Sequence, residues 1–417
     1  MRLYIDPGTG SMLFTILIGV LSAAVYGLRN VFYKLRFILS GGKTDKRDDQ
    51  RIGIAIFTDS KRYWNVFEPI CDELEHRGQD AVYLTASPDD PALEKAKQYE
   101  HVKCEFVGEG NKAYARMNML KADLVLSSTP GLDVYQWKRS RDVSWYVHIP
   151  HMATDVTLYR MFGLDYYDAI LCSGEYQIEQ VRKIEEKRGL PRKEMTLVGI
   201  TYFDEMKARL DKLAGNVAKR DGINVLLAPS WGPSSIFNRF GADFIQRLID
   251  TGYNIIIRPH PQSFVSEKEL MDSLMAQFPE SEKLEWNRDN DNFDVLSRSD
   301  IMISDFSGVI FDFSLVFDKP VIYVDAPFDD SVYDACWLDE KTWTFRTLPE
   351  IGKPLSEDSM DELPSMIEEC LRENKYRDAR KRARDESWAY PGEAAYRTVD
   401  YLISKRNEIL RNKEKAE

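Results

Sequence analysis

The sequence predicts an α/β protein of two successive domains, each with a parallel sheet, that face a cleft and follow one N-terminal transmembrane helix. Three observations lead to this prediction. Short apolar runs alternate with helical segments, as in βαβ units. The alternation restarts after a polar linker at 214–222. An uncharged run of 18 residues precedes the first strand, and this is close to the shortest helix that spans a bilayer.

Length and charge limit the function classes. The chain has 417 residues, 43% hydrophobic and 30% charged, which is ordinary for a folded protein of two to three domains. Its net charge is −12, but residues 1–50 hold seven Lys/Arg and four Asp/Glu, so they carry +3 and the remainder carries −15. An acidic body argues against nucleic-acid binding, and a basic N-terminal collar favours a membrane surface.

The uncharged run is Ser11–Leu28, and residues 1–50 are predicted to form a membrane anchor and a basic linker. Six cations follow the run within residues 29–47, whereas only Arg2 precedes it. The positive-inside rule therefore predicts a single-pass cell-membrane protein with its folded domains in the cytoplasm. A re-entrant or surface-lying helix is one alternative. A cleaved signal peptide is another, although its positive charge would precede the apolar run.

The first α/β domain is expected at 51–215. A helical stretch between its first two strands carries Val66, Ile70 and Leu74 four residues apart. Six apolar or alternating runs are predicted as strands: 52–57, 81–84, 101–107, 123–127, 144–148 and 169–172.

The second α/β domain is expected at 216–375, with a helix at 240–249. The last helices, 376–417, are expected to pack back on the first domain. Four apolar runs are predicted as strands of the second sheet: 224–228, 254–258, 301–305 and 320–324. Ligands of open parallel sheets bind at the carboxyl ends of the strands, so the loops after these strands are the place to seek chemistry.

Two loops of the second domain carry candidate catalytic residues. In Arg258-Pro259-His260-Pro261 the prolines fix the backbone around His260, which suits a catalytic imidazole, although a turn with an incidental histidine is the alternative. In the loop that begins at Ile303, Asp305 is a candidate base, a residue that orients His260, or a helix cap.

The same loop carries candidate phosphate ligands. The hydroxyl groups of Ser304 and Ser307 and the amide of Gly308 stand where a strand ends and an apolar helix begins. Backbone N–H groups at a helix start bind phosphate. Simple capping of that helix is the alternative.

The first domain offers two histidines just after a strand, His148 and His151. Either could be a general base for a hydroxyl group, because the pKa of imidazole is near neutral. His148 is at the end of the strand and His151 is in the loop, so His151 is preferred and the choice stays open. Pro150 argues against a metal-binding helix. Asp289-Asn290-Asp291 resembles a metal-binding triplet, but such triplets are common in charged loops, so neither a metal nor a cofactor is expected.

Several motifs in order resemble the CDP-glycerol:poly(glycerophosphate) glycerophosphotransferase family, the teichoic-acid primases and polymerases. They are 258–261, 291–292 ahead of Leu296, 303–313 and 319–323. The resemblance covers about 140–400. It implies a GT-B-type fold of two Rossmann-like domains and a donor nucleotide held mainly by the second domain.

The resemblance also implies site residues. The family's second functional histidine maps to His260, and the first maps to the region of His148 and His151. Ser230 lies in a matching loop, 228–231. Three positions depart from the family pattern: Met152 replaces a usual Gly, Gly232 an Arg, and Gly308 a Ser.

The expected activity is transfer of glycerol phosphate, or a related polyol phosphate, from CDP-glycerol to a hydroxyl of a lipid-linked or cell-envelope glycan. His151 or His148 would be the base and His260 would stabilise the diphosphate. Phosphoryl transfer needs mainly positioning and charge stabilisation. The expected donor ligands are Ser230, Arg258, Ser304, Ser307 and Gly308.

Two other functions stay open. One is a nucleotide-sugar glycosyltransferase or epimerase on the same scaffold. The other is a non-catalytic, membrane-tethered scaffold of envelope assembly. The acidic domains would repel an anionic donor unless the cleft is locally basic. The side chains of Arg258, Arg239 and Lys319 are the expected source of that positive charge.

Overall fold

The computed structural model describes residues 51–213, 220–289, 291–325, 328–373 and 375–415. The chain from Ile52 onward forms one compact unit. The predicted transmembrane helix, Ser11–Leu28, lies outside the described residues and stays a prediction. Along the described part of the chain, no helix combines the length and apolar character needed to cross a membrane.

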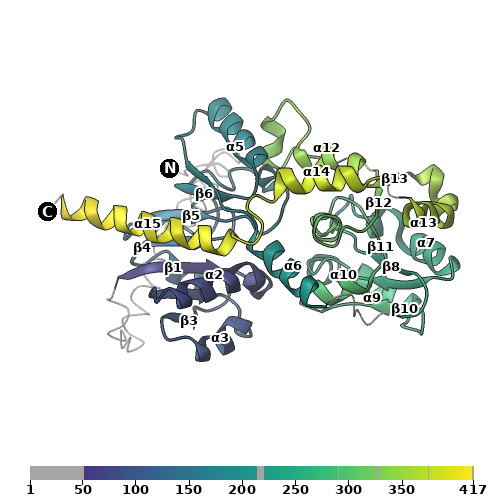
Figure 1. The fold of residues 1–417 in the computed structure, drawn as a ribbon, viewed down its shortest axis with the longest axis horizontal. Helices are drawn as coiled ribbons and strands as arrows, with labels where there is room; N and C mark the ends of the chain where they lie inside the picture. The colour runs from purple at the N-terminus through teal and green to yellow at the C-terminus, as the bar shows by residue number, and fades with distance from the viewer. Residues whose placement is uncertain (1–50, 214–219, 290, 326–327, 374, 416–417) are drawn as a thin grey trace, which may run out of the picture. The chain divides into compact units, whose positions relative to one another are not determined.

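The first sheet has seven parallel strands in the order β3-β2-β1-β4-β5-β6-β7 (Figure 1). The six strands predicted for this domain are confirmed, and the edge strand β7 was not foreseen. The bounds are β1 Ile52–Thr58, β2 Ala81–Thr85, β3 Val102–Phe106, β4 Ala122–Ser127, β5 Val143–His148, β6 Ala169–Cys172 and β7 Glu194–Leu197.

The second sheet has six parallel strands in the order β10-β9-β8-β11-β12-β13. The four predicted strands are confirmed, while β10 and β13 were missed. The bounds are β8 Asn224–Leu227, β9 Asn254–Ile257, β10 Leu284–Trp286, β11 Ile301–Ser304, β12 Val321–Val324 and β13 Lys353–Leu355.

The strand order reverses at one place in each sheet. In the first sheet β1 lies between β2 and β4, and in the second β8 lies between β9 and β11. The carboxyl ends are in register there, with Phe57 opposite Ser127 and Leu227 opposite Ile303. Such reversal points are where open α/β sheets bind ligands.

Helices cover both sheets (Figure 1). In α2 the predicted apolar spacing is confirmed, because Val66, Ile70 and Leu74 are all buried. The bounds are α2 Trp64–His76, α3 Pro91–Lys95, α4 Asn111–Met117, α5 Glu175–Arg188, α6 Thr201–Leu213, α7 Ile236–Asp250, α8 Ser263–Ser266, α9 Lys268–Gln277, α10 Phe293–Arg298, α11 Val309–Phe311, α12 Trp343–Ile351, α13 Leu363–Arg372, α14 Arg377–Ser387 and α15 Ala394–Glu414. Short 3-10 turns include η1 Lys61–Tyr63, and a π-helix, η4 Asp312–Val316, continues α11.

The last helix returns to the first sheet although it follows the second one in the chain. α15 contacts α2, β1 and β4, and α14 contacts α5, α12 and η4. Asp204 of α6 anchors the segment between them, since its carboxylate accepts from Trp388 Nε1 at 2.8 Å, Gly392 N at 2.7 Å and Ala394 N at 2.9 Å.

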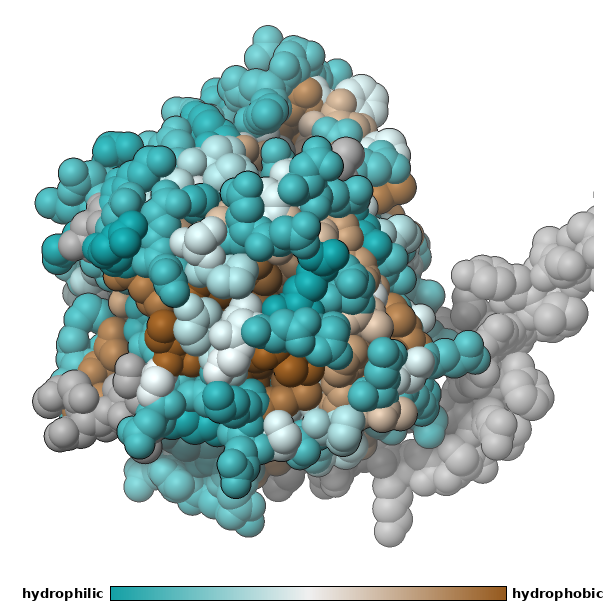
Figure 2. Space-filling view, turned by 90° about the vertical axis from the view of Figure 1, so that its right-hand side faces the viewer, coloured by the Kyte–Doolittle hydropathy of each residue, from teal (hydrophilic) through white to brown (hydrophobic). Residues whose placement is uncertain are grey.

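The outer surface of the second sheet's covering helices is polar. α13 buries Leu363, Ile367 and Cys370, spaced three to four residues apart, and contacts β11, β12 and β13. Figure 2 shows a face covered mostly by hydrophilic residues, with hydrophobic residues visible in patches between them near the middle. Such a mixed surface is ordinary for a folded domain and does not by itself mark a binding site.

Candidate active site at the ends of the parallel strands

Loops from both sheets meet near the strand ends. The ring of Tyr63, from the turn after β1, lies 4.6 Å from the ring of His151, from the loop after β5. A Cβ added to Gly308, in the loop after β11, would lie 3.1 Å from Met152 Sδ and 3.7 Å from Thr154 Cγ2. The loops after β1, β5 and β11 therefore form one continuous region.

His148 lies in the core behind this region. Its side chain is fully buried, its Nε2 is 3.3 Å from the hydroxyl of Tyr159, and its ring packs edge-on against Tyr159 and Tyr167. Burial lowers its pKa well below the usual value, and His151 adds to the shift. Its surroundings are those of a packed core histidine.

His151 lies toward the second domain. It is half-buried, and its Nδ1 is buried without a hydrogen-bond partner. Burial lowers its pKa to about 4, the backbone of Ser128 opposes the shift, and the charge of His260 adds to it. The imidazole is therefore neutral at pH 7 and can accept a proton. The Nδ1 of His148 is likewise buried without a hydrogen-bond partner. The two histidines differ in exposure, since His148 is fully buried and His151 is half-buried, and this difference favours His151.

His260 is held in one orientation by its own loop. The amide of Gln262 donates to Nδ1 at 3.1 Å, and Ser263 N donates to the carbonyl of His260 at 2.8 Å. In the neutral ring the proton is therefore on Nε2, which can donate to a ligand. Burial lowers the pKa of His260 to about 4, Arg62 adds to the shift, and Glu267 opposes it.

Asp305 holds the two neighbouring loops. Its buried carboxylate accepts from Ser230 N at 2.9 and 3.1 Å, from Ile236 N at 3.2 Å and from Phe306 N at 2.7 Å. Burial raises its pKa, and the backbone hydrogen bonds oppose the shift. These bonds join the end of β11 to the β8 loop and the start of α7, so the contacts of Asp305 are those of a positioning residue.

The predicted phosphate ligands differ in availability. Ser304 is buried, and its hydroxyl donates to the carbonyl of Ala228 at 2.5 Å. Ser307 and Gly308 are half-buried and directly precede the short α11. They are therefore more exposed than Ser304, whose hydroxyl is already engaged.

Two of the departures from the family pattern are in contact with each other. Met152 replaces a small residue and Gly308 replaces a side-chain-bearing one, and the thioether of Met152 occupies the space beside Gly308. A serine at 308 would require Met152 to move. The third departure, Gly232, has φ of +90° with no atom within 4 Å of an added Cβ, so a side chain there would be strained by its backbone and not by lack of space.

The expected cations are largely engaged elsewhere. Lys319 Nζ donates to the carbonyls of Leu296, Ser297 and Ser299, at 3.0, 2.5 and 2.6 Å, at the end of α10. Arg239 pairs with Glu357 at 2.9 Å. Each of these two side chains thus makes a local structural contact, and the expectation that they make the cleft basic stays a prediction.

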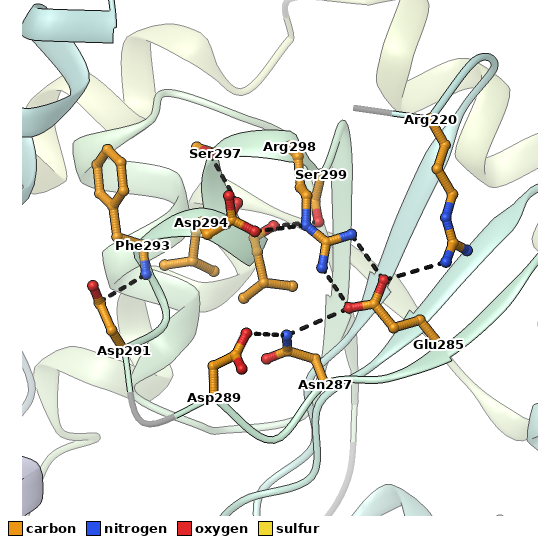
Figure 3. A network of polar contacts seen from close by, with 12 residues as sticks. Arg220, Glu285, Asn287, Asp289, Asp291, Phe293, Asp294, Ser297, Arg298 and Ser299 are labelled. Carbon is orange, nitrogen blue, oxygen red and sulfur yellow. Dashed lines mark hydrogen bonds and ion pairs between the residues drawn. The ribbon is translucent and has the colours of Figure 1, made fainter. Parts of the chain in front are cut away.

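Arg258 is built into a polar network. Its guanidinium donates to the side chain of Asn287 and to the carbonyl of Asp289 at 2.8 Å. Figure 3 shows Asn287 between Asp289 and Glu285, and Glu285 in turn pairs with Arg298. This network fixes the start of the loop that carries His260.

The Asp289–Asp291 triplet has structural partners. Asp289 accepts from Asn287 Nδ2 at 2.8 Å (Figure 3). Asp291 accepts from Phe293 N at 3.0 Å and pairs with Arg209 at 2.6 Å. Within the described ranges, no group of three or more His, Cys, Asp or Glu is placed to hold a metal ion.

The sequence analysis did not identify the residues after β1 as site residues. Asp59 Oδ1 is buried without a hydrogen-bond partner. Arg62 is exposed and precedes Tyr63, whose ring packs against that of His151. Ser128, after β4, also has a buried hydroxyl without a partner. Buried polar atoms are normally satisfied, so such a group at a strand-order reversal indicates a place for ligand or water. The signal was available, since these residues directly follow two predicted strands.

A buried cluster links α6 to η4 and to the start of α10 in the second domain. The hydroxyl of Tyr202 is 2.8 Å from Asn292 Oδ1 and 3.0 Å from Asp312 Oδ2, and Asn292 Nδ2 is 3.3 Å from the same oxygen. Burial raises the pKa of Asp312 to about 7, while the hydrogen bonds from Tyr202 and Asn292 and the charge of Arg258 oppose the shift.

Comparisons with known proteins agree with this arrangement. Residues 176–404 match the family described as CDP-Glycerol:Poly(glycerophosphate) glycerophosphotransferase. No curated protein sequence matches the chain.

Among solved structures, two of the wall teichoic acid polymerase TagF with CDPG match with TM-scores of 0.57 and 0.59, at 14% and 16% identity, each over 93% of this chain and 99% of that chain. The UDP-GlcNAc 2-epimerase of Methanocaldococcus jannaschii matches with a TM-score of 0.51 at 12% identity, over 85% of this chain and 100% of that one. These likenesses show the fold, two Rossmann-like domains of the GT-B type, and confirm that part of the prediction.

Proposed function

The chain belongs to the CDP-Glycerol:Poly(glycerophosphate) glycerophosphotransferase family, and from this premise we propose that it transfers glycerol phosphate, or a related polyol phosphate, from CDP-glycerol to a hydroxyl group of a lipid-linked or cell-envelope glycan. The observation that carries the proposal is the pair of largely buried imidazoles after parallel strands, His151 after β5 and His260 after β9. Burial lowers the pKa of each to about 4, so both rings are neutral at pH 7.

In the proposed reaction, the acceptor oxygen attacks the phosphorus that bears glycerol. A new P–O bond forms to the acceptor, the bond between the two phosphates of the donor breaks, and CMP leaves with that electron pair. His151 takes the proton of the acceptor hydroxyl. The Nε2–H of His260 donates to the diphosphate, where negative charge develops.

Other residues position the reacting groups. Asp305 fixes the loop of Ser230 relative to Ser307 and Gly308 through the backbone bonds described above. Arg258 fixes the loop of His260. Such fixed positioning accounts for much of the rate enhancement in phosphoryl transfer.

The proposal includes attachment to the cell membrane through Ser11–Leu28, with the two α/β domains in the cytoplasm, where nucleotide-activated donors are made. The uncharged run and the six cations after it support this topology. Fractionation of cells that express the full chain tests it: the protein should sediment with membranes and resist extraction by salt. Recovery of the uncleaved chain in the soluble fraction would contradict the anchor.

The activity is tested with the purified full chain in detergent. CDP-glycerol, CDP-ribitol and a UDP-sugar are offered separately with membrane lipid extract as acceptor, and nucleotide release is measured. We expect CMP from CDP-glycerol, lowered at least about 100-fold in His260→Ala and in His151→Ala. His76→Ala is the matched control, because that side chain is 83% exposed on α2.

The other outcomes separate the alternatives. Release of UDP would favour a nucleotide-sugar enzyme on this fold. No turnover and no binding of any of the nucleotides would favour a scaffold without catalysis.

A further inference from the structure

Asp155 lies four residues after His151 in the loop that follows β5, and its carboxylate is buried at the start of a helix of the second domain. Trp343 N donates to Oδ1 at 2.7 Å, and Thr344 N donates to Oδ2 at 2.7 Å. These donors are the first two residues of α12, and the residue before them, Thr342, makes no capping hydrogen bond through its side chain. The cap of α12 therefore comes from the other domain.

The charge of Asp155 is compensated by hydrogen-bond donors. A third donor is Gln180 Nε2 of α5. All three donors belong to uncharged residues, and the start of α12 also presents the positive end of its helix dipole. Hydrogen bonds to a carboxylate are about twice as strong as those between neutral groups, so this contact ties the loop firmly to α12.

Helix α5 holds the two residues that precede Asp155. The hydroxyl of Tyr176 donates to the carbonyl of Ala153 at 3.0 Å, and Gln177 Nε2 donates to the carbonyl of Thr154 at 2.9 Å. The three residues from Ala153 to Asp155 are thus bonded to α5 through their backbone or side chain, and Asp155 is bonded to α12 as well. The loop that carries the proposed base has one position relative to both helices.

Trp343 connects this loop to the proposed phosphate ligands. Its ring is buried, stacks on Tyr176 with the ring centroids 4.7 Å apart, and packs against Phe311 at 4.9 Å. Phe311 ends α11, which directly follows Gly308. The contacts of Asp155 therefore extend from the loop of the first domain to the element that begins at the proposed donor site.

We propose that Asp155 is a positioning residue that fixes His151 relative to the loop of Ser307 and Gly308 in the second domain. This inference rests on the proposed function, in which His151 takes the proton of the acceptor hydroxyl. Asp155 acts through the backbone of its own loop and through α12. The reaction requires the base, the acceptor oxygen and the phosphorus to be aligned, and a displacement of about 1 Å can lower the rate about 100-fold.

The test measures three quantities on the full chain in detergent. Release of CMP from CDP-glycerol with membrane lipid extract gives kcat, calorimetry without an acceptor gives the Kd of CDP-glycerol, and urea unfolding gives the stability. Asp155→Asn places an NH2 group against an N–H donor of α12. We expect it to lower kcat about 10- to 100-fold and to change the Kd less than about twofold, because the donor is held mainly by the second domain. Asp155→Ala should lower kcat further, because alanine has no acceptor oxygen.

Asp204→Asn is the matched control. Asp204 also accepts three hydrogen bonds of 2.7–2.9 Å from another segment of the chain, and its donors, Trp388, Gly392 and Ala394, are not residues of the candidate site. It should lower the stability to a similar extent and leave kcat within about twofold of the wild type.

Tyr176→Phe is a second test that keeps the ring stacked on Trp343 and removes only the hydroxyl that holds Ala153. It should lower kcat several-fold at unchanged Kd. If Asp155→Asn does not fold, an unchanged kcat in Tyr176→Phe overturns the inference by itself.

The remaining outcomes separate this inference from the proposed function. A loss of kcat in Asp155→Asn no larger than that in Asp204→Asn would overturn the inference, because the loss would follow from stability alone. A weaker Kd that accounts for the whole loss of activity would also overturn it, because Asp155 would then act in donor binding. Either result would leave the proposed function intact. Failure of the wild type to release CMP would instead refute the proposed function.

Discussion

Asp312→Asn replaces one oxygen of a buried carboxyl group with an amide and removes its ability to ionise. In the folded chain the pKa of Asp312 is raised to about 7, mainly by burial, whereas the ordinary value is 3.8. A raised pKa means that the folded state binds the proton more tightly. The stabilisation is fully present below pH 4 and is lost as the pH rises to about 7.

The difference of about three pKa units corresponds to roughly 4 kcal/mol at 1.36 kcal/mol per unit. Asparagine keeps an oxygen that can accept from Tyr202 and Asn292, but it loses the attraction of Arg258. We therefore expect Asp312→Asn to be more stable than the wild type at pH 8 by about 2–4 kcal/mol and to differ little from it at pH 4.

Urea unfolding of the full chain, followed by tryptophan fluorescence in one detergent at pH 5 and pH 8, measures the effect. The free energy of unfolding of the wild type should fall more between these values than that of Asp312→Asn. Asp291→Asn is the control, since that carboxylate is 49% exposed and pairs with Arg209. If Asp312→Asn is less stable at pH 8, then Tyr202, Asn292 and Arg258 stabilise the ionised carboxylate and the reasoning is refuted.

Three further outcomes are expected. The kcat/KM for CMP release should stay level from pH 8 to pH 6 and fall as the pH approaches 4, because burial lowers the pKa of His151 and of His260 to about 4; a midpoint near 6.5 would show an unperturbed imidazole. Lys319→Met should lower the urea midpoint by the equivalent of about 1–3 kcal/mol without changing the Kd of CDP-glycerol; weaker donor binding at unchanged stability would contradict its structural assignment. Gly308→Ser should lower CMP release several-fold, and Met152→Gly in the same chain should restore it; additive losses in the double variant would show that the two positions are independent.

Local sequence determined the parallel sheets. Runs such as Ile52–Phe57 and Ile301–Ser304 are apolar on both faces because helices cover both sides of the sheet. A buried parallel strand can therefore be recognised from one short segment of sequence. The edge strands β7, β10 and β13 lack this signal. They are three or four residues long and include polar residues or proline, so no apolar run marks them.

The motifs of the second domain could also be identified from the sequence, because each is contiguous and follows a strand. His260 and Asp305 were identified in this way, and the structure places them at the ends of β9 and β11. The contacts of these two side chains could not be predicted from the sequence. Asp305 bonds to the amides of Ser230 and Ile236, which are about 70 residues away in the chain and come close only through the sheet order.

Tertiary structure alone decided which polar groups face one another. The sequence does not show which of Arg239, Lys319 and Arg62 has a partner, yet folding commits the first two to Glu357 and to the end of α10 and leaves the third exposed. The contact between Met152 and Gly308 joins two domains, so neither position explains the other along the chain. The periodicity of apolar residues predicts which face of a segment is buried within its own domain. The partner of a charge depends on three-dimensional distances between loops, which the sequence pattern does not encode.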